Sequence, residues 1–392
     1  MNSASDYQPQ QWESSSNEAL KISLISADAN EGAIQFLPNF TYPIFGDSET
    51  IYGYKDLVIH LVFDSITYKP FLNVKYSEKL ADANPQVDII DKLLNFLPVD
   101  DIILKDESKW VDTFTEERQG FDIPSLGEKV SEYTSDNDDE TFSIYKFSIS
   151  DFFTKDKKSP VIKYWERVQI FTILYIEAAT YLNLKDESNW NVYFIFNKST
   201  NAMIGYTTTY KYWNYSNGTK FDESDKLKYR EKISQFLIMP PYQGHGHGSH
   251  LYQSLYNKWL QDESIIELTV EDPNEQFDDL RDRNDLEMLY NTSDLFKNLK
   301  EMDTVSDEWI ELQRNQFKLE KRQFNRLIEM ILLYLKKVSL FKDIVKRRIY
   351  IKNYDSLCDI EDQDMKLQAI NESYNLVKED YERIIKLCKK LK

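Results

Sequence analysis

One stretch of the chain, residues 233 to 260, limits what the sequence can fold into more than any other. It begins with a short apolar segment, continues through two prolines into a loop with glycine at positions 244, 246 and 248, and ends in an amphipathic pattern typical of a helix. Alternating glycines allow successive backbone N–H groups to turn towards one point, and the first turn of the helix adds unpaired N–H groups. The sequence therefore predicts a strand, an anion-binding loop and a helix, in that order.

The two prolines, Pro240 and Pro241, define where the predicted strand ends. Proline cannot donate a hydrogen bond to a neighbouring strand, so the strand must part from its neighbour at Pro240. We expect this separation to open a cleft beside the C-terminal end of the strand.

The spacing of the glycines separates known kinds of phosphate loop. A P-loop needs a lysine followed by Ser or Thr after its last glycine, but Ser249 follows Gly248 directly. The spacing G-x-G-x-G also fits a dinucleotide fingerprint poorly. The pattern Q-x-x-G-x-G/A is met by Gln243, Gly246 and Gly248, and it resembles the acyl-CoA pyrophosphate loop of the GNAT superfamily of N-acetyltransferases. The alternative is an ordinary glycine-rich turn.

Composition and charge narrow the class of protein. A chain of 392 residues predicts two or three domains, and no apolar run reaches membrane-spanning length. The polar N-terminus lacks the features of a signal peptide, so we expect a soluble, intracellular protein without a membrane partner. Cys358 and Cys388 indicate neither a disulfide framework nor a zinc site. The net charge of −18 favours a basic partner over direct contact with nucleic acid.

Three further parts are predicted around the glycine loop. Residues 1–18 are polar and serine-rich, and we expect a disordered tail. Residues 19–140 contain apolar residues at a spacing of two, which predicts a β-rich N-terminal domain, and its acidic end SEYTSDNDDE predicts a mobile loop. Residues 300–392 predict a helical C-terminal domain, with apolar stripes at Phe324, Leu327, Ile331 and Leu335 and at Leu367, Ile370, Leu376 and Tyr381.

Residues 141–299 are expected to form the core domain that holds the loop. A helix should begin at Ser159 and continue to Leu182, because the apolar residues recur at helical spacing. Strands at 191–197 and 202–213 should form a hairpin that leads into the strand before the loop. The predicted fold class is α+β, with a mixed, largely antiparallel sheet.

The strand Ile266 to Val270 follows the predicted loop helix and ends at Glu271-Asp272-Pro273. A helical crossover places two strands parallel, so Glu271 should emerge at the same edge as the opened cleft. Acyl transfer to an amine needs a neutral amine, and a lysine pKa of about 10.4 means that a base must remove a proton. Glu271, Asp272 and Glu177 are the candidate bases, and the alternative is that Glu-Asp-Pro merely ends a strand. No motif indicates a covalent nucleophile, and the histidines of the loop lack the acidic partner of a metal site, so we expect no metal.

Several stretches of the sequence together resemble one family. FGDSETIYGYK, YIEAAT, IGYTTTYKYW, SQFLIMPPYQGHGHGSHLY, LTVEDPNEQFDDLRDRND and KLEKRQFNRLIEMILL are similar to the catalytic subunits of type B histone acetyltransferases of fungi, members of the GNAT superfamily. The resemblance covers residues 40 to 335. It implies a GNAT fold, acetyl-CoA as the acetyl donor, and tail lysines of newly made histone H4, bound with H3, as acceptors. It also implies a WD-repeat histone-binding subunit as partner, and a location in cytoplasm and nucleus.

The resemblance assigns roles to particular positions of this chain. Glu271 is implied as the general base, with Glu177 and Asp272 as supporting or alternative acids. The residues implied to bind acetyl-CoA are Phe236, Leu237, Ile238, Gln243, Gly244, His245, Gly246, His247, Gly248, Ser249, Asn274 and Arg283. The residues implied to line the histone groove are Asp47, Ser48, Glu49, Tyr210, Lys211 and Tyr212, although Asp47 to Glu49 also fit a solvated loop.

Two other functions stay open at this point. The chain could acetylate a small amine, or it could be a histone-binding scaffold with a vestigial acetyl-CoA site. Intact Gln243, Gly246, Gly248 and Glu271 argue against the scaffold, and the large N-terminal domain and acidic charge argue against a small amine.

Overall fold

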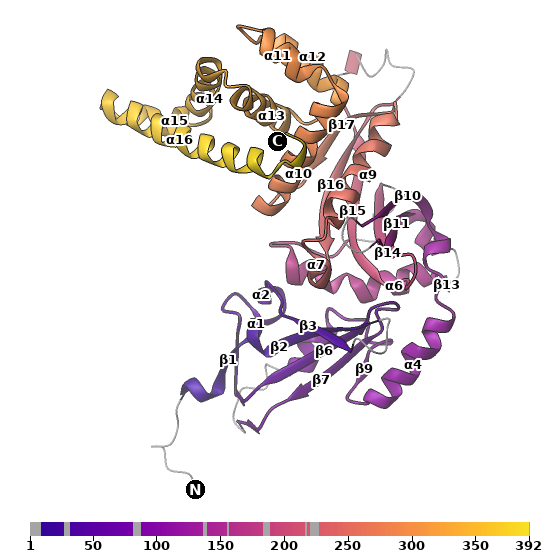
Figure 1. Ribbon diagram of the computed structural model, residues 1–392. Helices are drawn as coiled ribbons and strands as arrows, with labels where there is room; N and C mark the ends of the chain where they lie inside the picture. Colours follow the sequence, from indigo (N-terminus) through magenta and orange to yellow (C-terminus); the bar gives the residue numbers. More distant parts are fainter. Residues whose placement is uncertain are drawn as a thin grey trace. The chain divides into compact units, whose positions relative to one another are not determined.

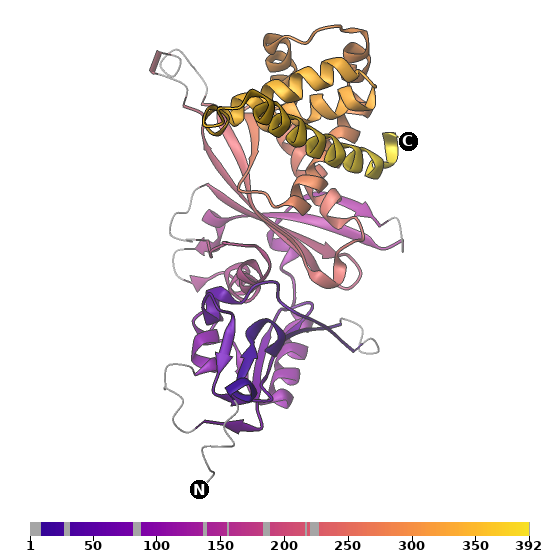
Figure 2. The same ribbon diagram turned by 90° about the vertical axis from the view of Figure 1, so that its left-hand side faces the viewer.

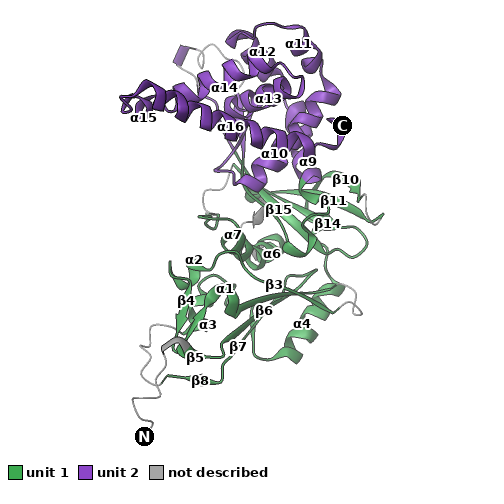
Figure 3. Cartoon of the chain, turned by 60° about the vertical axis from the view of Figure 1, so that its left-hand side comes forward, with its two compact units in different colours: residues 1–210, 233–248 green, residues 211–232, 249–392 purple. Residues whose placement is uncertain are grey.

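The computed structural model describes residues 9–26, 32–80, 88–135, 139–154, 157–182, 189–215, 218–219 and 227–391. The chain divides into two compact units, coloured separately in Figure 3. Unit 1 comprises residues 1–210 and 233–248, and unit 2 comprises residues 211–232 and 249–392. No helix among the described residues has the length and apolar character needed to cross a membrane.

The first part of unit 1 is built around a five-stranded sheet in the order β3-β2-β6-β7-β9. Strand β2 pairs antiparallel with β3 and parallel with β6, β6 pairs antiparallel with β7, and β7 pairs parallel with β9. The elements of this part are η2 (Pro9–Trp12), β1 (Glu13–Ser15), α1 (Ser16–Ala19), β2 (Leu20–Ile25), β3 (Ala33–Phe36), α2 (Tyr42–Phe45), β4 (Thr50–Tyr52), β5 (Tyr54–Lys55), β6 (Val58–Asp64), β7 (Pro70–Lys75), β8 (Glu78–Lys79), α3 (Ile89–Leu94), β9 (Ile103–Leu104), α4 (Glu107–Gln119) and η3 (Pro124–Leu126).

The alternating apolar residues of β2 and β6 explain why this sheet forms. Leu20, Ile22 and Leu24 are buried on one face of β2, and their polar neighbours along the strand are less buried. Helix α4 runs alongside the sheet in Figure 1 and Figure 2, and its Trp110 ring packs 5.4 Å from the Phe71 ring of β7. The alternation of residues along the sequence therefore predicted the β-rich part correctly.

Part of the predicted disordered tail has regular structure. Residues 1–8 lie outside the described residues, but residues 9–18 form η2, β1 and most of α1. Strand β1 pairs antiparallel with β4, with Glu13 opposite Tyr52. The expectation of disorder through residue 18 was wrong because backbone pairing with β4 stabilises a segment whose composition alone is polar.

The second part of unit 1 holds the larger part of a second sheet, in the order β10-β11-β14-β15-β16. Strands β14 and β15 form the predicted antiparallel hairpin, which is confirmed. Strands β15 and β16 continue into unit 2, where β17 lies next to β16. The elements are β10 (Glu128–Thr134), β11 (Thr141–Ser148), α5 (Ile149–Phe152), β12 (Phe153–Thr154), β13 (Lys157–Lys158), α6 (Pro160–Val168), α7 (Ile170–Tyr175), β14 (Trp190–Asn197), β15 (Met203–Trp213), β16 (Tyr229–Ile238) and η4 (Pro240–Tyr242).

The helix predicted from Ser159 to Leu182 is two shorter helices. The Ser159 hydroxyl accepts the cap hydrogen bond from the Ile162 N–H, as expected, but α6 ends at Val168 and α7 ends at Tyr175. Beyond α7, Ala178 has φ +57°, which a helix cannot contain. The apolar spacing misled the prediction because α7 is entirely buried and six of the nine residues of α6 are buried, so the apolar pattern continues across the break.

The acidic tract SEYTSDNDDE was also predicted incorrectly in part. Residues 131–134 belong to β10, and Glu132 pairs with Ser143 of β11 across the sheet. Residues 136–138 lie outside the described residues. Edge strands commonly carry charged side chains, so an acidic composition does not exclude a strand.

Unit 2 contains β17 and the C-terminal helices. Hydrogen bonds join the Tyr229 N–H to the Ser264 carbonyl and the Thr269 hydroxyl to the Glu231 carbonyl, so β16 and β17 advance in the same direction. The predicted parallel arrangement is therefore correct. The elements are α9 (His247–Gln261, which begins in unit 1), β17 (Ile265–Val270), α10 (Glu275–Thr292), α11 (Leu295–Glu301), α12 (Asp307–Phe317), α13 (Lys321–Tyr334), α14 (Val338–Lys352), α15 (Tyr354–Cys358), α16 (Gln363–Leu387) and η5 (Lys389–Leu391).

The two predicted C-terminal stripes had different outcomes. Phe324, Leu327 and Ile331 are buried on α13, which confirms most of the first stripe, whereas Leu335 follows the end of the helix and is half-buried. Helix α16 also forms, and Ile370 and Tyr381 are buried as predicted, together with Ile384. Leu367 and Leu376 are instead 57% and 68% exposed. The second stripe was therefore only half correct, because apolar residues occur on both faces of α16.

Candidate functional site

The glycine loop follows β16 as predicted. Strand β16 ends at Ile238, η4 spans Pro240 to Tyr242, and α9 begins at His247. Gly244 and Gly246 have φ values of +82° and +88°, a region that other residues adopt only with strain. The Gln243 side chain fixes the start of the loop, because its Nε2 donates to the Ile238 carbonyl at 2.8 Å.

The loop has the form of a cradle for an anionic group. A Cβ atom placed at Gly244 or Gly246 would have no protein atom within 4 Å, so the space over the backbone is open. Residues 243–246 are exposed. Backbone N–H groups in such a loop, with those at the start of α9, suit the phosphates of acetyl-CoA.

The strand before the loop approaches its neighbour closely. A Cβ at Gly205 of β15 would lie 2.6 Å from the Leu237 carbonyl oxygen, so only glycine permits this approach. Leu237 is buried, whereas Phe236 and Ile238 are only half-buried on the alternate face of β16. The structure therefore brings together Phe236 to Ile238 and the loop through Gly248, all within unit 1.

His247 is oriented differently from the other loop residues. Its side chain is only 5% exposed, and its Nδ1 lies 2.8 Å from the hydroxyl of Tyr133 on β10. The His247 ring also meets the edge of the Phe142 ring at 4.5 Å between centroids. The imidazole therefore contacts the sheet, and a contribution of His247 to cofactor binding would come from its backbone.

The predicted base Glu271 lies in unit 2, directly after β17. Its Oε1 is 2.6 Å from Nζ of Lys232, which projects from β16. The Glu271 side chain is 42% exposed and the Lys232 side chain 26%. Asp272 follows with φ +36°, in the left-handed region of backbone conformation.

Glu177, the third candidate base, belongs to unit 1 and is exposed. It comes after the end of α7, where the Ala178 N–H donates to the Tyr42 hydroxyl at 2.6 Å. The structure therefore places Glu177 on the surface rather than in a desolvated site.

Three residues assigned to acetyl-CoA lie in unit 2 and already make other contacts. The Ser249 hydroxyl accepts from Nδ2 of Asn284 at 3.1 Å. Asn274 caps α10, because its Oδ1 accepts from the Phe277 N–H at 2.9 Å. Arg283 donates through Nε to the Asp279 carbonyl. The Ser249 contact joins α10 to α9, whereas the contacts of Asn274 and Arg283 lie within α10 and its N-cap.

The segment Asp47 to Glu49 combines two different environments. Asp47 and Ser48 are exposed in a turn. Glu49 instead accepts hydrogen bonds from the N–H groups of Thr41 and Tyr42, at 2.6 and 3.0 Å, and from Asn17 at 2.8 Å. Partial burial raises the pKa of Glu49, but these hydrogen bonds outweigh it and hold the pKa below its ordinary value. Glu49 thus stabilises the start of α2.

The second predicted part of the histone groove is also engaged in packing. The Tyr210 ring lies 4.9 Å from that of Trp190 in unit 1. In unit 2, Nζ of Lys211 lies 4.4 Å from the centre of the Tyr229 ring, and the Tyr212 hydroxyl is 3.3 Å from that of Thr269.

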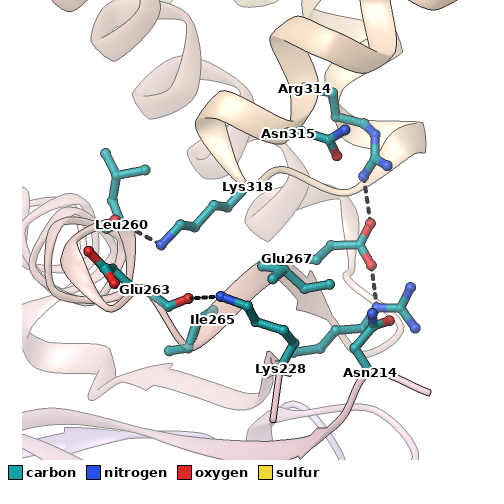
Figure 4. Close-up of a pocket in the computed structure, with 11 residues that line it drawn as sticks. Asn214, Lys228, Leu260, Glu263, Ile265, Glu267, Arg314, Asn315 and Lys318 are labelled. Atoms are coloured by element: carbon teal, nitrogen blue, oxygen red, sulfur yellow. Dashed lines mark hydrogen bonds and ion pairs between the residues drawn. The ribbon is translucent and has the colours of Figure 1, made fainter. Parts of the chain in front are cut away.

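A cavity of about 810 Å³ lies in unit 2, and none of the predicted site residues is among the residues that line it (Figure 4). Glu267 lies between Arg230 and Arg314, at 2.5 and 2.6 Å, and Nζ of Lys318 donates to the Leu260 carbonyl at 2.8 Å. These three cations are held by protein oxygens, so the cavity is not built as an anion site.

Comparison with known proteins places these features in a family. Residues 12–177 match "Histone acetyl transferase HAT1 N-terminus", residues 159–278 match "Acetyltransferase (GNAT) family", and residues 282–337 match "Fungal HAT1, C-terminal". Among solved structures, the chain is similar over 34% of its length to 78% of an aminoglycoside acetyltransferase from an uncultured soil sample, with 16% identity and a TM-score of 0.24. The mixed sheet, the glycine loop and the match of residues 159–278 to the GNAT family define an N-acetyltransferase of the GNAT superfamily.

Relatives along the whole chain make the assignment more specific. Histone acetyltransferase type B catalytic subunits from Kluyveromyces lactis and Candida glabrata are 48% and 49% identical, and the alignments cover 97% and 98% of this chain and 94% and 96% of the relatives. The Candida albicans protein of the same name is 45% identical, over 96% of this chain and 91% of its own. The chain belongs to the family of type B histone acetyltransferase catalytic subunits. It is an acetyltransferase, and its acetyl donor is acetyl-CoA.

Proposed function

We propose that the enzyme transfers acetyl from acetyl-CoA to lysines in the N-terminal tail of newly made histone H4, by direct attack assisted by a carboxylate base. The observation that carries this proposal is the open glycine loop after β16, in a chain that belongs to the type B family. When bound, acetyl-CoA supplies the acetyl group as a reactive thioester.

The loop residues bind and orient the donor in this proposal. The N–H groups of Gly244 to Gly248 hold the pyrophosphate, with the partial positive charge at the start of α9. Phe236 and Ile238, which are half-buried on β16, contact the remainder of the donor. Asn274 and Arg283 remain candidates for contacts from unit 2.

Glu271 serves as the general base. A lysine side chain is protonated at neutral pH, and Glu271 removes a proton from it directly or through one water. Lys232 donates to Oε1 at 2.6 Å and so fixes the position of the carboxylate. Asp272 and Glu177 are the alternative bases.

The acidity of the chain supports a cationic acceptor. A net charge of −18 attracts a lysine- and arginine-rich tail and repels nucleic acid. Asp47, Ser48, Glu49 and Tyr210 to Tyr212 are proposed to line the groove, with Asp47 as the free carboxylate among them. A WD-repeat histone-binding subunit and histone H3 are proposed as partners, and cytoplasm and nucleus as locations.

An acceptor comparison tests this function. The protein is incubated with radiolabelled acetyl-CoA and either an H4 tail peptide, a polyamine or no acceptor. Label in the peptide at rates far above those for the polyamine supports the proposal. A preference for the polyamine indicates an enzyme for small amines, and binding of peptide without any transfer indicates a scaffold.

A further inference from the structure

Tyr133 and His247 connect the edge of a sheet with the cofactor loop. Tyr133 lies in β10, the last strand of its sheet, and His247 is the first residue of α9 and lies between two glycines of the loop. The two residues are separated by 114 positions in the sequence, yet the Tyr133 hydroxyl and Nδ1 of His247 are 2.8 Å apart within unit 1. We propose that Tyr133 is a positioning residue that holds the acetyl-CoA pyrophosphate loop through His247.

The packing around this hydrogen bond leaves the imidazole little freedom. Tyr133 faces Phe142 across the β10–β11 pair, and their rings stack with centroids 5.4 Å apart. The Phe142 ring meets the His247 ring edge-on at 4.5 Å, and the imidazole is only 5% exposed. The hydrogen bond therefore sets the orientation of a ring that is already confined by aromatic neighbours.

The hydrogen bond between Tyr133 and His247 matters because the part of the loop just before His247 is intrinsically flexible. Gly244 and Gly246 precede His247, and glycine allows many backbone conformations. A loop that must order on binding loses affinity for its ligand, whereas a loop held in its bound form does not. Fixing the His247 side chain fixes the backbone N–H groups at the start of α9, which are those proposed to face the pyrophosphate.

The phenol is chemically suited to this role. Burial raises the pKa of Tyr133 above its ordinary value, so the hydroxyl keeps its proton at neutral pH. A neutral hydroxyl can donate to Nδ1 or accept from it, so the contact survives in either imidazole tautomer. Phenylalanine at position 133 would retain the ring stacking and lose the hydrogen bond.

This inference rests on the proposed role of the loop in binding acetyl-CoA, and the variants test the two claims separately. Tyr133→Phe removes the hydroxyl, and Tyr145→Phe removes a hydroxyl from the neighbouring strand β11 as a matched control. His247→Asn places an amide close to the position of Nδ1, whereas His247→Gln places it close to that of Nε2. Gly246→Val tests the loop itself.

Each variant is assayed with acetyl-CoA and with acetyl-pantetheine, a donor that lacks the pyrophosphate. Tyr133→Phe should raise the KM and Kd for acetyl-CoA about 5-fold, the size of one hydrogen bond, and leave kcat, the peptide KM and acetyl-pantetheine turnover unchanged. Tyr145→Phe should match the wild type, and His247→Asn should retain more affinity for acetyl-CoA than His247→Gln.

Three results would overturn the inference. One is an unchanged Kd for acetyl-CoA in Tyr133→Phe, and another is an equal loss with acetyl-pantetheine, which would indicate a general structural effect. The third is a greater loss in His247→Asn than in His247→Gln. Normal acetyl-CoA binding by Gly246→Val would instead contradict the proposed role of the loop, on which the inference about Tyr133 rests.

Discussion

Nζ of Lys232 lies 2.6 Å from Oε1 of Glu271, so a lysine on β16 holds the carboxylate proposed as the catalytic base. We expect Lys232→Met to lower kcat by up to about 100-fold, because a freed carboxylate no longer keeps its position. The free energy of unfolding should change by less than about 1 kcal/mol, since the pair is partly exposed. Steady-state kinetics measure kcat and urea titration measures the free energy of unfolding, with Lys228→Met as the control variant. A variant with normal kcat would show that Lys232 does not position the base.

Gly246 provides the most direct test of the loop. Valine cannot adopt φ +88° without strain, and its side chain would project into the open space over the loop. Gly246→Val should therefore abolish acetyl-CoA binding in calorimetry while far-ultraviolet circular dichroism stays unchanged. Gly120→Val is the matched control, because Gly120 has φ −105° and equally open surroundings. Normal affinity in Gly246→Val would contradict the assignment.

Asp47 and Glu49 should give different phenotypes although only one residue separates them. Asp47→Asn should raise the KM for an H4 tail peptide and flatten its salt dependence, because an exposed carboxylate that attracts a cationic tail is lost. Glu49→Gln should lower the free energy of unfolding by about 1–3 kcal/mol, since the amide cannot accept all the hydrogen bonds made to the carboxylate. Kinetics at low salt and chemical denaturation measure the two effects. Equal behaviour of the variants would contradict this division of roles.

The raised pKa of Asp285 leads to a prediction of how the free energy of unfolding depends on pH. It is buried, accepts from the Tyr252 hydroxyl and from Nε2 of Gln323, and burial raises its pKa to about 6 from an ordinary value of 3.8. The folded state therefore binds the proton more tightly, and this contribution to stability is present below pH 4 and lost as pH rises through 6. Asp101 and Glu117 have lowered pKa values. Unlike that of Asp285, their contributions to the free energy of unfolding are therefore lost as the pH falls.

The corresponding measurement is the free energy of unfolding at pH 5.0 and pH 7.5. We expect the wild type to lose about 1–2 kcal/mol from Asp285 between these values, and Asp285→Asn to lose correspondingly less. The same pH dependence in both proteins would show that Asp285 does not titrate in this range.

Local chemistry made much of the glycine loop predictable. Glycine is the residue best suited to φ values such as those of Gly244 and Gly246, so the spacing of the glycines in the sequence indicated the backbone conformation of the loop. The hairpin of β14 and β15 was equally visible as two strand-forming segments around a polar turn. These features depend on residues close together in the sequence.

Other features depended on contacts between distant residues. Tyr133 was missed because it lies in an acidic tract, and its role comes from His247, 114 positions away. The contact of Lys232 with Glu271 spans 39 positions and has no local signal. Glu49 was read as a groove residue because nothing in its neighbours indicated hydrogen bonds from Asn17 and Thr41. Tertiary structure alone decides such roles.

The pH dependence of kcat in Glu271→Gln tests the proposed mechanism most directly. The substitution keeps the shape of the side chain and removes its basicity, so kcat with an H4 tail peptide should fall about 10²- to 10⁴-fold at neutral pH. Acetyl-CoA affinity should stay near normal, and activity should partly recover at higher pH, where more of the lysine is already neutral. Full activity in Glu271→Gln, with loss of activity in Glu177→Gln or Asp272→Asn, would show that the base lies elsewhere, and full activity in all three would contradict the mechanism.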